Sequence, residues 1–423
     1  MQLLMMAAGS APAAGGFDVD QATQAYMAMV QGAARARSDA YFEGGYWLLL
    51  WNALLSVLIN WALLHFGWSA RWSAWARRVG KGPTRRVMLY VIPYLLVTTL
   101  ILLPWSLYTG YFREHQYGLS NLSMAGWFGE EGKDLLVNLV VGPLIIAGIF
   151  AVIRRAPRSW WVWGALVMTS FTALGALVFP VLIAPLFNQY TPMQPGPLRD
   201  QILAMAHAQH IPADNIYVSD ASRQSDRISA NVSGLGPTVR ITLNDNLLKR
   251  VSPPGVKAVM GHEMGHYMLN HVVSLIGEFA LVWLLVFFLL WWLSPRLLKR
   301  HAGRWKVSDP ADPAALPLYV ALGSAIMLLL TPVTNSITRV HEIEADAFGL
   351  DAAREPDGFA GVSMMLGEYR KLQPGRLEEI IFFDHPSGYN RVRRSMEWKA
   401  QHLNELPPEQ RGIMRPAPLP AKF

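Results

Sequence analysis

Val259–His266 reads V-M-G-H-E-M-G-H, and this short stretch decides how the rest of the chain is interpreted. It places H-E-x-x-H in a segment of helical character, where residues four apart lie on one face, about 5–6 Å apart at Cβ. His262 and His266 in that arrangement can bind one Zn²⁺. Glu263 lies beside them, in the position of a general base for an activated water. A chance match, or two histidines on an amphipathic helix, is the alternative.

The composition is typical of a membrane protein. Hydrophobic residues make up 52% of the 423 residues and charged residues only 16%, whereas soluble domains are about a quarter charged. Much of the net charge of +7 lies in short Arg-rich loops between apolar segments, which favours a role in membrane orientation over nucleic-acid binding. The chain has no cysteine, so any metal site must use His, Asp or Glu.

Six apolar segments are long enough to cross a bilayer, since a membrane helix needs about 20 mostly apolar residues. They are Tyr46–Phe66, Val87–Tyr108, Leu135–Ile153, Trp160–Leu182, Val272–Leu293 and Leu316–Ser336. We therefore predict a mainly α-helical polytopic membrane protein with six transmembrane helices around a chamber, plus a small α+β domain that holds the H-E-x-x-H motif. Glu278 lies within the fifth segment, and ionisable groups at that depth usually face an interior.

The polar region between the fourth and fifth segments combines two predicted strands with the motif helix. Asn215–Val218 and Thr238–Leu243 are rich in β-branched residues, which favours strands. Pro197–His210 has a helical pattern. We expect the motif helix to continue through Tyr267–His271 directly into the fifth segment.

A third metal ligand follows from the helical hairpin that the fifth and sixth segments are expected to form. At 1.5 Å per residue, His266 lies about 9 Å before the fifth segment, and Glu342 lies about as far past the sixth. A hairpin brings both to the same membrane face. Glu342 and Asp346 are four residues apart, so we assign Glu342 to the metal and Asp346 to a hydrogen bond with the imidazole of His262. An acidic surface patch is the alternative, and the competing candidates for the third ligand are His341 and Glu344.

Five ordered blocks resemble the type I CAAX prenyl proteases, a family of integral-membrane zinc endopeptidases with prokaryotic relatives. The blocks, each with the family pattern that it resembles, are Arg113–Ser120 (E-x-x-F-G-F-N), Pro185–Pro192 (P-x-F-N-x-F-T-P), Gly265–His271 (G-H-W-x-x-N-H), Glu342–Ala347 (E-x-x-A-D-A) and His385–Arg391 (H-P-x-x-x-x-R). The best-known members have seven membrane helices, whereas six segments are found here.

The resemblance implies roles for particular residues. It implies that His262, His266 and Glu342 bind one Zn²⁺ per chain, with Glu263 as general base. It also implies that His385, together with Arg391, donates to the oxygen that gains charge during peptide hydrolysis.

The resemblance also points to a strand that holds substrate. The family's S-N-A-aromatic edge strand corresponds to Ile228–Asn231, where Ser229 stands at the family's Asn position. Strand addition uses main-chain groups, so we expect extended substrate to pair along the backbone of Ser229, Ala230, Asn231 and Val232.

These assignments divide the chain into six parts. We predict an N-terminal segment at 1–43, transmembrane helices 1–4 at 44–183, a zinc metalloprotease region at 184–271, transmembrane helices 5 and 6 at 272–336, a C-terminal helical part of the catalytic domain at 337–400 and a Pro-rich tail at 401–423. Residues 1–16 lack the basic start of a signal peptide.

The function predicted from motif and resemblance is an integral-membrane zinc endopeptidase that cleaves prenylated or other short C-terminal peptides. The alternatives are a membrane-protein quality-control protease with the same chemistry and a non-catalytic, zinc-stabilised transporter or scaffold. Glu263 favours the enzymes, because a purely structural site needs ligands and no general base. The expected partners are a peptide or protein substrate, with or without a lipid modification, and the lipid bilayer, with no nucleic acid.

We expect the bacterial inner membrane as the location, but two arguments disagree about which side the zinc site faces. The loops after the first, third and fifth segments are rich in Arg and Lys and lie on one side. The positive-inside rule makes that side cytoplasmic and puts the zinc site on the extracytoplasmic face. The resemblance implies a site that faces the cytosol.

Overall fold

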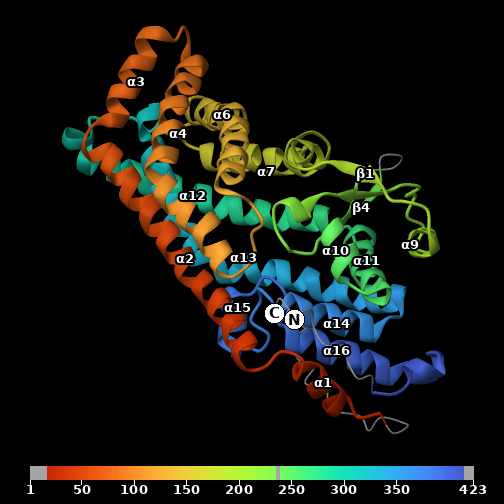
Figure 1. Cartoon of the computed structure of the whole chain (residues 1–423). Helices are drawn as coiled ribbons and strands as arrows, with labels where there is room; N and C mark the ends of the chain where they lie inside the picture. The colour runs from red at the N-terminus through yellow and green to blue at the C-terminus, as the bar shows by residue number, and fades with distance from the viewer. Residues whose placement is uncertain (1–16, 235–238, 414–423) are drawn as a thin grey trace.

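The computed structural model describes residues 17–234 and 239–413, and long helices account for most of them (Figure 1). The expectation for residues 1–16 and the end of the predicted Pro-rich tail lie outside these ranges.

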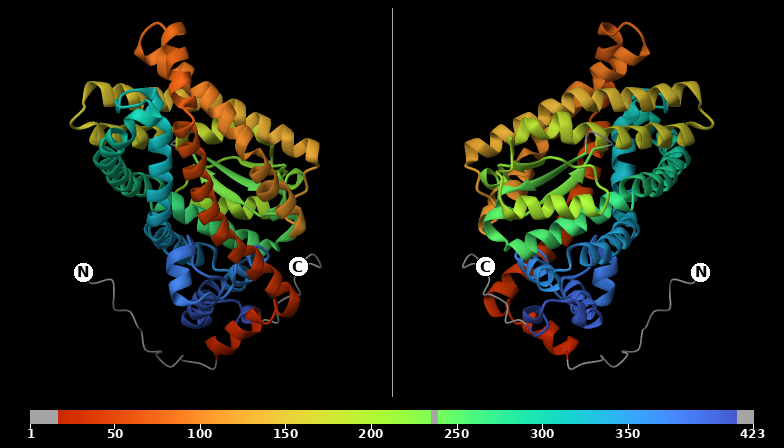
Figure 2. Two further views of the ribbon diagram at one scale, coloured as in Figure 1. Left: turned by 90° about the vertical axis from the view of Figure 1, so that its left-hand side faces the viewer. Right: turned by 90° about the vertical axis from the view of Figure 1, so that its right-hand side faces the viewer.

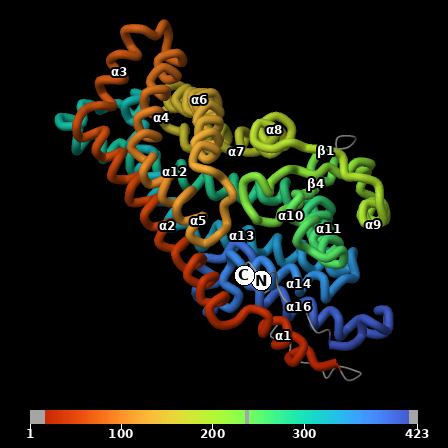
Figure 3. The backbone as a smooth tube through the Cα atoms, viewed as in Figure 1, coloured from red at the N-terminus to blue at the C-terminus, as the bar shows by residue number. Residues whose placement is uncertain are grey.

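Six helices among the described residues are long and apolar enough to cross a membrane, which confirms the prediction of a six-helix polytopic protein. The spans are α2 (Gly32–His65), α4 (Pro83–Leu107) with its extension to Gln116, α6 (Met124–Arg155), α7 (Trp160–Val178) with its extension to Phe187, α12 (His271–Trp305) and α13 (Leu316–Ala353). The extension of α4 ends in α5 (Arg113–Gln116), and that of α7 ends in α8 (Ala184–Phe187). Figure 3 follows the chain from α7 through α8 into the first strand.

Eight further α-helices among the described residues are shorter than the spans and lie outside them. They are α1 (Val19–Met27), α3 (Trp68–Val79), α9 (Pro197–Ala208), α10 (Asp245–Arg250), α11 (Pro253–Met268), α14 (Pro356–Leu366), α15 (Arg376–Phe382) and α16 (Gly388–Gln401). Both views in Figure 2 place the C-terminal helices at one end of the molecule and α3 at the other.

A four-stranded sheet supports the motif helix. Its strands are β1 (Tyr190–Pro192), β2 (Ile216–Ser219), β3 (Ala230–Ser233) and β4 (Arg240–Asn244), in the order β1-β2-β4-β3. β2 and β4 are parallel, whereas β3 pairs antiparallel with β4 and forms an edge of the sheet. Ile241 and Leu243 of β4 are fully buried and lie in one apolar core with Met260 and Met264 of α11. The sheet therefore fixes one side of α11, and the two strands predicted in this region form as β2 and β4.

The predicted unbroken helix from the motif into the fifth span is wrong. α11 ends at Met268, and α12 begins at His271. Between them, Asn270 has a φ of 55°, a left-handed conformation that interrupts helical hydrogen bonding and that Asn tolerates better than most residues. The break turns the chain so that Nδ1 of His271 lies 3.0 Å from Nδ1 of His266.

α11 and α13 cross at very short distance because small residues line both helices at the contact. A Cβ atom on Gly261 would lie 2.7 Å from the carbonyl oxygen of Gly349, and one on Gly265 would lie 3.1 Å from Cα of Ala345. A Cβ atom on Gly349 would in turn lie 2.7 Å from the backbone nitrogen of His262. This close approach brings the H-E-x-x-H motif against the acidic end of α13.

Candidate active site

Three predicted ligand side chains converge where α11 meets α13. Nε2 of His262 lies 3.1 Å from Nε2 of His266 and 3.2 Å from Oε2 of Glu342. Nε2 of His266 lies 3.4 Å from Oε1 of Glu342. Ligand atoms bound at about 2.0–2.2 Å to a tetrahedral ion lie about 3.3–3.6 Å from one another. The spacing of this donor set therefore fits a divalent metal ion.

Asp346 lies behind His262, as the helical spacing of Glu342 and Asp346 predicts. Its Oδ1 atom is 2.8 Å from Nδ1 of His262, and its side chain is fully buried. Burial opposes the charged form of His262, but the nearby carboxylates of Asp346 and Glu342 outweigh this effect and raise its pKa to about 9. The two carboxylates thus favour a positive charge at this ring, whether a proton or a metal ion supplies it.

His341 and Glu344, the competing candidates for the third ligand, do not join this group. They form a separate group with His271, on the other side of the ring of His266. The role of His271 was not predicted, because its contact with His266 depends on the break between α11 and α12.

Arg391 is held by Asp346 rather than free in the pocket. Its Nε and Nη2 atoms donate to the two oxygens of Asp346 at 3.0 and 2.5 Å. Burial opposes the charged form of Arg391, but Asp346 outweighs it and raises the pKa of the guanidinium above its usual range. Asp346 therefore connects His262 on one side to Arg391 on the other.

His385 completes the group from the segment before α16. Its Nε2 atom is 3.2 Å from Oε2 of Glu342, and its Nδ1 atom is 2.8 Å from Oδ1 of Asp384. Burial lowers the pKa of His385, and Asp384 opposes that effect. Asp384 was not among the predicted site residues, although it directly precedes the H-P pair that identified His385.

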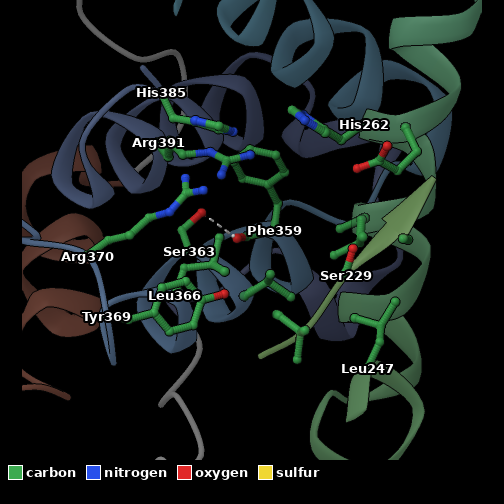
Figure 4. Close-up of a pocket in the computed structure, with 16 residues that line it drawn as sticks. Ser229, Leu247, His262, Phe359, Ser363, Leu366, Tyr369, Arg370, His385 and Arg391 are labelled. Atoms are coloured by element: carbon green, nitrogen blue, oxygen red, sulfur yellow. Dashed lines mark hydrogen bonds between the residues drawn. The ribbon is translucent and has the colours of Figure 1, made fainter. Parts of the chain in front are cut away.

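Glu263 faces a cavity of about 230 Å³ whose wall also includes His262, His385 and Arg391 (Figure 4). Burial raises the pKa of Glu263, while His262 and His266 oppose the effect. Figure 4 shows that the side chains of His385, Arg391 and His262 approach the cavity from different elements. Leu247, Phe359 and Leu366 add apolar surface to its lining.

The predicted substrate strand forms the other wall of the cavity. Ser229 and Ala230 line it, and β3 is an edge strand whose outer side pairs with no described strand. The amide of Ser229 donates to the side chain of Asn244, and its carbonyl accepts from the amide of Asn244. Main-chain groups alternate in direction along a strand, so those of Ala230 and Val232 face the free edge, while those of Ser229 and Asn231 face β4.

Comparisons with known proteins identify the family of the chain. Residues 21–189 match the CAAX prenyl protease N-terminal family, which is described as having five membrane helices. In this chain, four candidate membrane spans lie within that region. Residues 192–399 match peptidase family M48. The uncharacterized metalloprotease YhfN of Bacillus subtilis (strain 168) is 28% identical over 308 residues, which is 72% of this chain and 72% of that protein. CAAX prenyl protease 1 of Saccharomyces cerevisiae is 29% identical over 274 residues, 60% of this chain and 59% of the yeast protein.

A solved structure shares the fold. The crystal structure of S. mikatae Ste24p superimposes with a TM-score of 0.70 and 20% sequence identity, and the match covers 89% of this chain and 96% of that chain. The two family matches, to residues 21–189 and 192–399, together extend over nearly all the described residues. The chain therefore belongs to peptidase family M48, and it is an integral-membrane, CAAX prenyl protease-like metalloprotease.

Proposed function

We propose that this protein is a zinc-dependent endopeptidase that hydrolyses peptide bonds in the cavity between β3 and α11, with Glu263 as general base. The observation that carries the proposal is the convergence of His262, His266 and Glu342 beside Glu263 and an open strand edge. A structural metal site would need the first three side chains but neither a buried carboxylate facing a cavity nor a strand edge.

Zinc is the metal that the donor set supports best. Two imidazoles and one carboxylate form a ligand set of catalytic zinc sites, whereas Mg²⁺ and Ca²⁺ prefer oxygen ligands throughout. Zinc bound by His262, His266 and Glu342 would acidify a water and polarise the substrate carbonyl. Asp346 would keep the ring of His262 in the orientation that binding requires.

The protein's own side chains carry the proton transfers. Glu263 accepts a proton from the attacking water and passes it to the leaving amine. His385 donates a hydrogen bond to the carbonyl oxygen as that atom gains negative charge, and Asp384 orients the donor ring. Arg391 contributes positive charge from the cavity wall while Asp346 fixes its position.

Extended substrate would be aligned by the free edge of β3. The main-chain groups of Ala230 and Val232 are positioned to pair with it, and Ser229 and Asn231 support β3 from the β4 side. The cavity beside the strand is partly apolar, so the side chain next to the scissile bond would meet Leu247 and Phe359.

The substrate class that we favour is a prenylated or other short C-terminal peptide. Support comes from the yeast relative, which is named a CAAX prenyl protease. A quality-control protease that cleaves misfolded membrane proteins remains the second candidate, because the site chemistry is the same for both. We propose the bacterial cell membrane as the location, because the chain has six candidate membrane spans and is 28% identical to a bacterial metalloprotease over 72% of its length.

The test is proteolysis by purified protein in detergent, comparing the wild type with Glu263→Ala at measured zinc content. The substrates are a prenylated C-terminal peptide, its unprenylated counterpart and an unfolded protein. We expect about one tightly bound zinc in both proteins and cleavage by the wild type alone, with the preferred substrate deciding between the two protease candidates. Equal cleavage by the variant would show that Glu263 is not the general base. Zinc binding without cleavage of any substrate would favour the non-catalytic scaffold or transporter.

A further inference from the structure

A second cluster of metal-binding side chains lies directly behind the first. His271 at the start of α12, together with His341 and Glu344 on α13, places one ligand atom per residue within 4.8 Å of the others. Both imidazoles are buried, and their ring centroids are 4.6 Å apart. The proposed proteolytic mechanism uses none of these three side chains.

Glu278 sets the tautomer of His341. Its Oε2 atom lies 2.8 Å from Nε2 of His341 and accepts the hydrogen on that nitrogen. The lone pair of the ring is then on Nδ1, a buried atom with no hydrogen-bond partner in the part of the chain that the structure describes. A carboxylate on one ring nitrogen and a free lone pair on the other is the arrangement of a metal-binding histidine.

The nitrogen that carries the free lone pair lies close to the other two side chains of the cluster. Nδ1 of His341 lies 3.8 Å from Oε2 of Glu344, and the same oxygen lies 3.2 Å from Nε2 of His271. Around a tetrahedral ion with bonds of about 2.0–2.2 Å, ligand atoms are about 3.3–3.6 Å apart. The two distances bracket that separation, so small side-chain shifts would fit an ion between the three atoms.

We propose that His271, His341 and Glu344 form a second divalent-metal site, which takes Zn²⁺ or a transition metal of similar ligand preference. It is weaker than the first site because the side chain of Glu344 is 53% exposed, whereas that of Glu342 is 9% exposed. A solvated carboxylate loses more hydration and more rotamer freedom when it binds an ion.

The second site is coupled to the first through two facing imidazoles, and this consequence rests on the proposed function. Nδ1 of His266 and Nδ1 of His271 are 3.0 Å apart, a contact with room for one hydrogen. With metal on Nε2 of His266 alone, its Nδ1–H donates to His271. Metal on Nε2 of His271 requires the ring lone pair on that nitrogen, so the hydrogen of the ring lies on Nδ1, and two N–H groups then oppose each other across this contact. Filling the second site therefore disturbs a ligand of the first and inhibits proteolysis.

The experiment is a zinc titration of the purified full-length protein, with zinc per chain measured by mass spectrometry and proteolysis followed in parallel. We expect the wild type to bind one zinc tightly and a second more weakly, with activity falling as the second binds. Glu344→Gln and His341→Phe should bind only the first zinc and lose the inhibition. Glu278→Ala should weaken the second zinc by about 10-fold or more, because it frees the tautomer of His341.

Asp214→Asn is the control, because it removes an exposed carboxylate that lies 3.8 Å from Nε2 of His207 on α9, outside both groups of metal-binding side chains. It should bind both zinc ions as the wild type does. The proposal is overturned if the wild type binds a single zinc at every concentration at which it stays in solution, or if Glu344→Gln still binds two. Zinc counts do not depend on activity, so a protein that cuts no substrate refutes the proposed function without deciding the second site.

Discussion

Asp346 contacts both a proposed metal ligand, His262, and a charged residue of the cavity wall, Arg391. It contacts Nδ1 of His262 at 2.8 Å and accepts two hydrogen bonds from Arg391, with no exposed surface. One buried carboxylate thus orients a metal ligand and fixes a positive charge on the cavity wall. Removing its negative charge takes from the buried Arg391 the carboxylate that accepts its Nε and Nη2 hydrogen bonds, which is costly.

Asp346→Asn should lower zinc affinity by about 10- to 100-fold, since a neutral amide orients the imidazole less strongly than a carboxylate. Zinc affinity, measured by competition with a chelator, checks this. Asp351→Asn is the matched control, because Asp351 lies on the same helix and bonds Nε1 of Trp398 instead. Equal affinities in the two variants would contradict the role of Asp346.

Residue-scale prediction from the sequence succeeded where helical periodicity decides the geometry. The four-residue spacing predicted that His262 and His266 share a face of α11, and that Glu342 and Asp346 share a face of α13. It could not predict that Asp346 holds Arg391, or that His271 faces His266. Those contacts depend on how separate elements meet, and no local pattern encodes them.

At the scale of elements, the contact between α11 and α13 controls the metal site. Gly349→Ala would place a methyl group 2.7 Å from the backbone nitrogen of His262. We expect a stability loss of about 1–3 kcal/mol from overpacking, together with weaker zinc binding, because the ligands on the two helices move apart. Thermal unfolding and zinc affinity of the purified variant measure both effects.

Gly361→Ala in α14 is the control for this prediction. A Cβ atom at Gly361 meets no atom within 4 Å, so the substitution should be neutral or stabilise the helix by about 0.5–1 kcal/mol. The close-contact explanation fails if Gly349→Ala unfolds at the same temperature as the wild type and keeps its zinc affinity.

A second contact, between α2 and α15, should respond to pH. Glu378 accepts from Nζ of Lys371 at 2.8 Å and from the hydroxyl of Tyr46 at 2.8 Å. Burial opposes the charged form of Glu378, but these bonds outweigh it and depress its pKa. A depressed carboxylate pKa stabilises the fold above about pH 4.5, and the contribution is lost as pH falls through the folded pKa below that value.

The melting temperature should therefore fall less between about pH 5.5 and pH 3.5 in Glu378→Gln than in the wild type, because the variant has no charge to lose at this position. Thermal unfolding at the two pH values gives the comparison. An equal fall in both proteins would show that the contact does not contribute to acid sensitivity.

Element-scale prediction was good for long apolar helices and poorer for breaks and short strands. All six spans were found, because a run of apolar residues is a strong signal. The end of α11 was missed, since Leu269 and Asn270 can continue a helix and only the tertiary fold selects the left-handed conformation at Asn270. β1 was missed because three residues, one of them Pro192, give little strand signal.

At the scale of the whole molecule, the basic loops gather at the end opposite the metal site. Nη1 of Arg77 on α3 lies 2.9 Å from Oδ2 of Asp312 in the loop before α13, so the first and fifth loops meet. Glu342 lies 26 residues past the start of α13, or about 39 Å along a helix, which exceeds the hydrocarbon thickness of a bilayer. The basic loops and the metal site therefore lie on opposite faces of the membrane.

A cysteine scan can decide which face holds the site, because the natural chain has no cysteine. Ser308 is exposed in the basic loop, and Gln401 is exposed at the end of α16. If the basic end is cytoplasmic, an impermeant thiol reagent on intact cells should label Gln401→Cys and leave Ser308→Cys unmodified. The reverse pattern would place the metal site in the cytoplasm and overturn the charge-based orientation.

The most direct test of the central claim is zinc K-edge X-ray absorption on protein that holds one zinc per chain. We predict two imidazole nitrogens at about 2.0–2.1 Å with oxygen as the remaining ligands. Glu342→Gln should lose or alter this spectrum and lose proteolysis, whereas Glu344→Gln should leave the spectrum unchanged. An unchanged spectrum in Glu342→Gln with an altered one in Glu344→Gln would contradict the account, because the tightly bound metal would then lie in the second cluster.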